Sequence, residues 1–113
     1  MSYVCDTILK FSILENKNNV MEQVNSFFDD GDYFVMLDSE ALPAEARHWY
    51  GGSKAFQTPI AIGAFNYLDL PRLKEHLRNK VNWKYPKEVQ LIYCNEDDFG
   101  FQIWEPHAGK EFQ

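Results

Sequence analysis

The sequence contains no apolar run that approaches the roughly 20 residues of a membrane-spanning helix. Its first residues, Met-Ser-Tyr-Val-Cys-Asp, also lack the basic and apolar regions of a secretory signal peptide. We therefore expect a cytoplasmic protein that has no membrane partner.

Cysteine is scarce, and the motifs of common metal and catalytic sites are missing. The two cysteines are Cys5 and Cys94, and neither belongs to the Cys-x-x-Cys pair typical of zinc and dithiol sites. The patterns His-Glu-x-x-His, Gly-x-Ser-x-Gly and Gly-x-Gly-x-x-Gly do not occur. The Gly-Gly-Ser-Lys run at 51–54 lacks the residue order of a phosphate-binding loop. The sequence therefore predicts no catalytic residue, no metal site and no cofactor.

Positive charge is in deficit, because 11 Lys and Arg residues are outnumbered by 17 Asp and Glu residues, for a net charge of −6. A nucleic-acid-binding domain usually carries a basic surplus, so we expect no nucleic-acid partner. Acidic residues are concentrated before residue 46 and after residue 87, and the basic residues lie mainly between these regions. The partner that fits this distribution best is another protein with a basic surface. The basic block consists of Arg72, Lys74, Arg78, Lys80, Lys84 and Lys87.

The 113 residues, 45% of them apolar, are enough for one domain with its own core. Alternating apolar residues predict strands at 7–14, 58–68, 89–94 and 99–104, and a short apolar run predicts an interior strand at 33–37. A first helix is expected to begin at a capping box formed by Asn19 and Glu22 and to end at Gly31. A second helix is predicted after Asp69, with Pro71 in its first turn. Its apolar stripe would consist of Leu70, Leu73, Leu77 and Val81.

The order of these elements predicts a single α+β domain over 1–113, of the ferredoxin-like split βαβ (β-α-β-β-α-β) type. We expect the strand order four, one, three, two, with both helices on one face and an added carboxyl-terminal strand that forms a hairpin with the fourth. A short extra helix is expected in the middle connection, with Pro43 in its first turn, and residues 107–113 are expected to form a flexible tail. Antiparallel first and fourth strands would place Cys5 near Cys94.

Candidate binding residues fall into an aromatic segment and two acidic segments. His48, Trp49 and Tyr50 occur together in the longest irregular segment, and Trp and Tyr give a large contact area for few frozen torsions. The acidic segments lack the ligand spacing of the common helical calcium loop, so we interpret them as contacts to a basic partner. The predicted partner-binding residues are Asp29, Asp30, Asp32, His48, Trp49, Tyr50, Asp97 and Asp98.

These features favour a non-enzymatic protein-binding module, an inhibitor or immunity-type protein that neutralises another protein through acidic and aromatic contacts. The alternative is a homodimeric small-molecule-binding domain or small enzyme with a pocket on the open sheet face, in which His48 could carry a proton. A weaker alternative is base stacking of RNA on Phe65 and Tyr67. The pocket of the second hypothesis would be lined by Lys10, Phe65, Tyr67 and Trp104.

Overall fold

Five strands form one antiparallel sheet in the computed structural model, which describes residues 2–29, 31–43, 45 and 56–107. Across the sheet the strands follow the order β2-β3-β1-β4-β5. This agrees with the order predicted from the sequence, including the place of the fifth strand beside the fourth. The strands are β1 (Val4–Lys10), β2 (Val35–Met36), β3 (Ile60–Asn66), β4 (Gln90–Asn95) and β5 (Gln102–Trp104).

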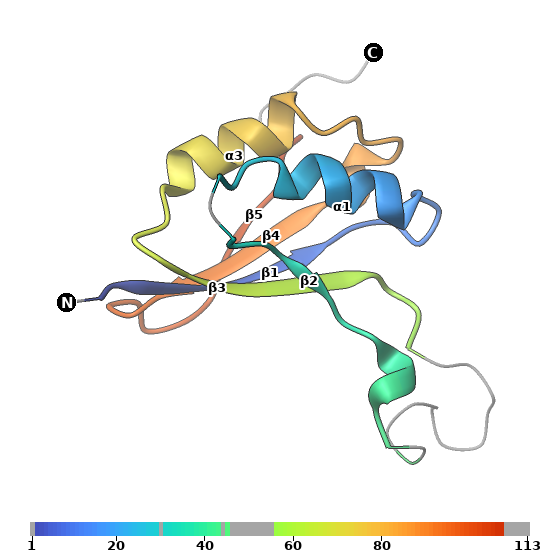
Figure 1. Cartoon of the computed structure of the whole chain (residues 1–113), viewed down its shortest axis with the longest axis horizontal. Coiled ribbons are helices and arrows are strands. Elements are labelled where there is room, and N and C mark those ends of the chain that lie inside the picture. The colour runs from blue at the N-terminus through green and yellow to red at the C-terminus, as the bar shows by residue number, and fades with distance from the viewer. Residues whose placement is uncertain (1, 30, 44, 46–55, 108–113) are drawn as a thin grey trace.

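Two helices, α1 (Lys17–Asn25) and α3 (Leu70–Asn79), cover one face of this sheet (Figure 1). Two short 3-10 helices, η1 (Ser39–Ala41) and η2 (Pro86–Glu88), lie in the connections. The described residues therefore form a small α+β domain. Among these residues, no helix has both the length and the apolar character needed to cross a membrane.

The first helix begins earlier than the sequence predicted. Its cap is Asn16, whose side-chain oxygen accepts a hydrogen bond from the backbone N–H of Asn19 at 3.1 Å. Asn19 therefore lies in the first turn, and the predicted capping box of Asn19 and Glu22 is wrong. The helix also ends earlier than predicted, at Asn25 rather than at Gly31, and its buried residues are Val20 and Val24.

The second helix agrees with the prediction. The Asp69 side chain caps it by accepting a hydrogen bond from the N–H of Arg72 at 3.2 Å, and Pro71 lies in the first turn. Leu73 and Leu77 are completely buried against the sheet. The stripe that predicted this helix is therefore its core-facing side.

All five strands differ from their predicted bounds, and the differences are largest in β1, β2 and β5, the last of which begins at Gln102 rather than at residue 99. β1 ends at Lys10, because the chain turns at Ser12, whose carbonyl accepts the N–H of Glu15 at 3.2 Å. Phe11 is buried, but Ile13, which a strand over 7–14 would place on the same side as Phe11, lies in this turn and is 50% exposed. β2 is an edge strand of two residues, and Val35 is 51% exposed, so the predicted interior strand is wrong.

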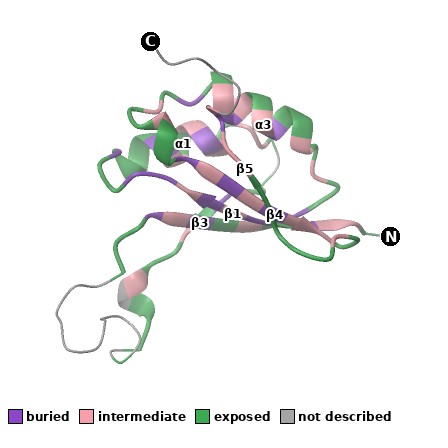
Figure 2. Cartoon of the chain, turned by 180° about the vertical axis from the view of Figure 1, so that it is seen from behind, coloured by how far each residue is buried: buried purple, intermediate pink, exposed green. Residues whose placement is uncertain are grey.

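The core lies between the helices and the covered face of the sheet. Buried residues alternate with more exposed ones along β1 and β4, as expected for strands that have helices on only one side (Figure 2). Leu9 and Leu91 are completely buried and face each other across β1 and β4. The short helix predicted after Pro43 lies almost entirely outside the described residues.

Candidate functional site

Several loops meet at the end of the sheet where β1 begins and where β3 and β4 end. Val4 pairs with Asn66 and Cys5 pairs with Asn95, so the starts and ends of these strands lie side by side. α1 ends and α3 begins toward the same end, on the side of the label N in Figure 1. We call this region the acidic end because six acidic residues belong to the loops and caps that meet there. They are Asp29, Asp32, Asp69, Glu96, Asp97 and Asp98.

Two tyrosines connect the parts of the acidic end. The rings of Tyr3 and Tyr67 have centroids 6.5 Å apart, and the backbone N–H of Tyr67 donates to the carbonyl of Tyr3 at 2.8 Å. Tyr67 has a φ of 53°, a conformation that is uncommon for residues other than glycine. Sparsely populated backbone conformations of this kind are often found where a binding surface is built.

Tyr67 joins the first acidic loop. Together with Asp29 and Asp32 it lines an open depression of about 260 Å³, between the end of α1 and the start of α3. Arg72 also lines it, and the Arg72 guanidinium lies 5.8 Å from the centre of the Phe27 ring. The depression therefore combines carboxylates, a tyrosine and one cation with an apolar lining that includes Phe27 and Phe28.

Tyr3 joins the second acidic loop, the turn after β4. Desolvation, followed by the charge of Asp97 and a hydrogen bond to its carboxylate, raises the pKa of the Tyr3 phenol. Asp98 shapes the turn, because its carboxylate accepts the N–H of Asn95 at 2.8 Å. The Glu96 carboxylate accepts the N–H of Val4 at 2.8 Å and ties the turn to β1. Asp97 is exposed at the tip.

The link between Tyr3 and Asp97 gives a testable prediction. Replacing Asp97 with asparagine removes the nearest negative charge, so the pKa of Tyr3 should fall toward the ordinary value of a tyrosine. Carbon-13 NMR of ring-labelled tyrosine, titrated in both proteins, measures this pKa residue by residue. Glu75→Gln, an exposed change on α3, should leave it unaltered. An unchanged Tyr3 pKa in Asp97→Asn would contradict the proximity of the two side chains.

The structure thus places four of the predicted partner-binding residues, Asp29, Asp32, Asp97 and Asp98, at the same end of the sheet, where the Tyr67 and Tyr3 pair lies between the two loops. The remaining four lie outside the described residues: Asp30, His48, Trp49 and Tyr50. The sequence interpretation missed Tyr3, because the strand was expected to begin only at residue 7. The shared position of the two acidic loops could have been found from the sequence. The expected topology already places the end of the first helix and the final hairpin turn at one end of the sheet.

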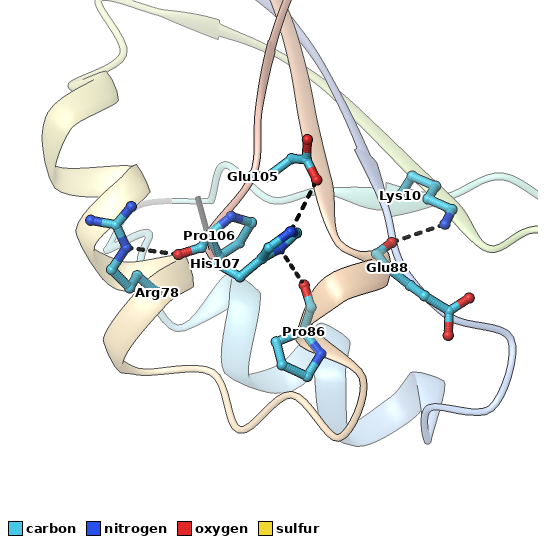
Figure 3. A network of polar contacts seen from close by, with 7 residues as sticks. All are labelled: Lys10, Arg78, Pro86, Glu88, Glu105, Pro106 and His107. Atoms are coloured by element: carbon cyan, nitrogen blue, oxygen red, sulfur yellow. Dashed lines mark hydrogen bonds and ion pairs between the residues drawn. The ribbon is translucent and has the colours of Figure 1, made fainter. Parts of the chain in front are cut away.

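The opposite end of the domain is held by polar contacts around the carboxyl-terminal segment (Figure 3). The Arg78 guanidinium donates to the carbonyl of Pro106 at 2.9 Å. The His107 ring contacts the carbonyl of Pro86 at 3.1 Å and the Glu105 carboxylate at 3.3 Å. His107 is thus half-buried and anchored, which differs from the tail expected from residue 107 onward. Residues 108–113 lie outside the described part of the chain.

The remaining histidine and cysteine side chains have structural positions. His76 bridges α3 and α1, because its Nε2 lies 2.7 Å from the carbonyl of Gln23. Cys94 pairs with Asp6, so the predicted proximity to Cys5 is confirmed along the strands. Cys5 is buried on the helix-covered face, whereas Cys94 lies on the other face, and both are free thiols. Burial raises the pKa of the Cys5 thiol, which makes it a poor nucleophile.

Two residues expected to line a pocket on the open sheet face instead face the helices. Phe65 is 4% exposed, and its ring stacks on Phe28 with centroids 4.6 Å apart. Trp104 pairs with the buried Leu91, and Arg78 of α3 lies 5.3 Å from its ring centre. Phe65 is also unavailable for the stacking of RNA bases. Phe65 and Trp104 therefore do not line the open sheet face, whereas Lys10 lies on that face and Tyr67 is exposed.

Neither metal ligands nor known relatives assign a chemistry to this site. Within 2–29, 31–43, 45 and 56–107, no group of three or more His, Cys, Asp or Glu side chains could hold a metal ion. Comparison of the chain with protein-family models, with curated proteins and with solved structures gives no match.

Proposed function

We propose that the protein is a non-enzymatic protein-binding module of the inhibitor or immunity type, which neutralises a partner that has a basic surface. The observation that supports this most strongly is that two acidic loops lie at the same end of the sheet, one beside Tyr67 and the other beside Tyr3, whose rings are paired. Carboxylates steer a basic partner toward the surface, and tyrosine rings supply short-range contact area.

The depression between α1 and α3 fits this function better than it fits a small-molecule site. Binding pockets for small molecules usually enclose most of the ligand and are lined mainly by apolar side chains. This depression is open, and Asp29, Asp32, Asp69 and Arg72 line it beside apolar side chains that include Phe27 and Phe28. A lysine or arginine side chain of a partner would find several carboxylates within reach there.

The fold that we propose for this module is the ferredoxin-like split βαβ arrangement with an added strand. The strand order and the two helices on one face support it. In this arrangement the end of the first helix, the start of the second helix and the turn after the fourth strand share one end of the sheet. The acidic end would therefore be a direct consequence of the topology.

Affinity capture from a lysate of the source cells, at low and high salt, tests the function. The tagged wild type should retain a basic protein at low salt and release it at high salt, because exposed charges are screened within about 10 Å at 0.1 M salt. A triple variant, Asp29→Asn, Asp32→Asn and Asp97→Asn, should lose most of this retention. Asp98 and Glu96 are left intact because their carboxylates accept backbone hydrogen bonds.

The matched control changes the net charge equally but away from the acidic end. It carries Glu22→Gln, Glu75→Gln and Glu88→Gln, three exposed residues on α1, α3 and η2. This control should retain the partner as the wild type does. Equal loss in both triple variants would show that only net charge matters, and equal retention would contradict a binding site at the acidic end.

A further inference from the structure

An apolar row crosses the whole sheet on the face that α1 and α3 leave open. Val35 pairs with Ile62, Ile62 with Ile8, Ile8 with Ile92, and Ile92 with Ile103, so one residue from each of the five strands belongs to it. All five side chains are β-branched and lie on the same face, because directly paired residues point the same way. We call this set the aliphatic row: Val35, Ile62, Ile8, Ile92 and Ile103.

The aliphatic row is accessible to solvent in the described structure. Val35 is 51% exposed, Ile62 42% and Ile103 62%, while Ile8 and Ile92 are half-buried. With strands about 4.8 Å apart, the row is roughly 20 Å long. The row and the surface directly on either side of it cover about 300 Å² of the face. The largest apolar patch on a soluble protein is commonly of about this size and often has a function.

We propose that the aliphatic row is the interface of a homodimer in which the open faces of two copies pack against each other. The row is self-complementary, because a twofold axis along it places each of its residues opposite the same residue of the second copy. This proposal does not depend on the acidic end, which belongs to the other side and one end of the sheet.

The charges that flank the row determine the direction of the axis. On the central strand β1, Asp6 and Lys10 lie two residues to either side of Ile8 and point to the same open face. A twofold axis along the row places Asp6 of one copy opposite Lys10 of the other, twice. An axis along β1 would instead place Asp6 opposite Asp6 and Lys10 opposite Lys10, and like charges would repel.

The geometry of sheet packing permits these contacts. Two sheets pack about 10 Å apart with their strands within about 30° of each other, so side chains two residues from the axis still meet their counterparts. Lys10 Nζ already lies at the rim of the face, where it donates to the carbonyl of Glu88 at 2.9 Å (Figure 3). The whole face offers roughly 500 Å² per copy, or about 1,000 Å² in total, the lower end for a specific interface, so the dimer should be weak.

Sedimentation velocity from low micromolar to about 1 mM protein measures this dimer, whose dissociation constant we expect between roughly 10 μM and 1 mM. Ile62→Thr with Ile103→Thr keeps β-branched side chains but adds hydroxyls to the interface of both copies. It should weaken dimerisation by roughly 10- to 100-fold. The control, Leu14→Thr with Phe99→Thr, changes two exposed apolar residues outside the row and should leave the dimer unaltered.

A charge exchange tests the axis without altering the apolar row. Asp6→Lys alone and Lys10→Asp alone should each weaken the dimer, and the double variant should restore it. Monomers at every wild-type concentration, or a dimer insensitive to the threonine pair, would overturn the proposal. So would single charge variants that dimerise like the wild type, or a monomer that binds a different protein through this face.

Discussion

Replacing Glu15 with alanine is expected to lower the free energy of unfolding by about 2–4 kcal/mol, because it removes two hydrogen bonds to a charged acceptor. Glu15 is 6% exposed, and its Oε2 accepts the backbone N–H groups of Lys84 and Tyr85, each at 2.9 Å. These bonds connect the turn before α1 to the segment after α3, nearly 70 residues away along the chain. For a domain with about 5–15 kcal/mol of total stability, the loss would be large.

Urea unfolding followed by tryptophan fluorescence measures this effect, since Trp83 lies within the connected segment. Glu15→Gln retains an acceptor oxygen and should recover at least half of the loss seen with alanine. Glu22→Gln, an exposed change on α1, should be neutral. If the alanine variant is as stable as the wild type, or if glutamine is no better than alanine, the two hydrogen bonds do not have the assigned role.

The second large effect is expected at Gly63, on the helix-covered side of β3. A Cβ atom built there would lie only 2.3 Å from Cζ and 2.7 Å from Cε2 of Phe65. The Phe65 ring is not free to swing aside, because it is held between Phe28 and Phe34, with centroid distances of 4.6 and 5.1 Å. Gly63→Ala should therefore cost about 1–3 kcal/mol of unfolding free energy through overpacking.

A double-mutant cycle isolates this clash. Phe65→Ala alone should cost about 3–5 kcal/mol, because it empties a site in the aromatic cluster. In that background Gly63→Ala should leave the free energy of unfolding unchanged or raise it. The ring is then absent, and alanine loses less conformational entropy on folding than glycine does. Additive effects of the two substitutions would show that the ring and the glycine do not compete for the same space.

The elements of the fold were predictable where several local signals agreed. α3 has a cap, a proline and an apolar stripe that agree with one another, and the structure confirms all three. The end of β1 was not predictable from alternation, because Phe11 remains buried after the strand has ended and the turn depends on Ser12. Glu15 was missed for a related reason: its partners are backbone groups nearly 70 residues away, and no sequence pattern identifies them.

The candidate site was predictable in part. Its carboxylates stand out as charged segments in the sequence, but their convergence depends on which ends of α1 and β4 lie together. Tyr3 and Tyr67 were not recognised as a pair, because a contact over 64 positions requires the exact register of β1 and β3. The aliphatic row likewise becomes visible only once all four strand pairings are known.

The most direct measurement of the central claim is the association rate of the captured basic partner with the protein, followed by stopped-flow fluorescence at increasing ionic strength. Electrostatic steering predicts a rate for the wild type that falls steeply with salt, and a lower, flatter rate for the variant with Asp29, Asp32 and Asp97 changed to asparagine. The variant with Glu22, Glu75 and Glu88 changed to glutamine should follow the wild type. Identical rates and salt dependence for all three proteins would contradict binding at the acidic end.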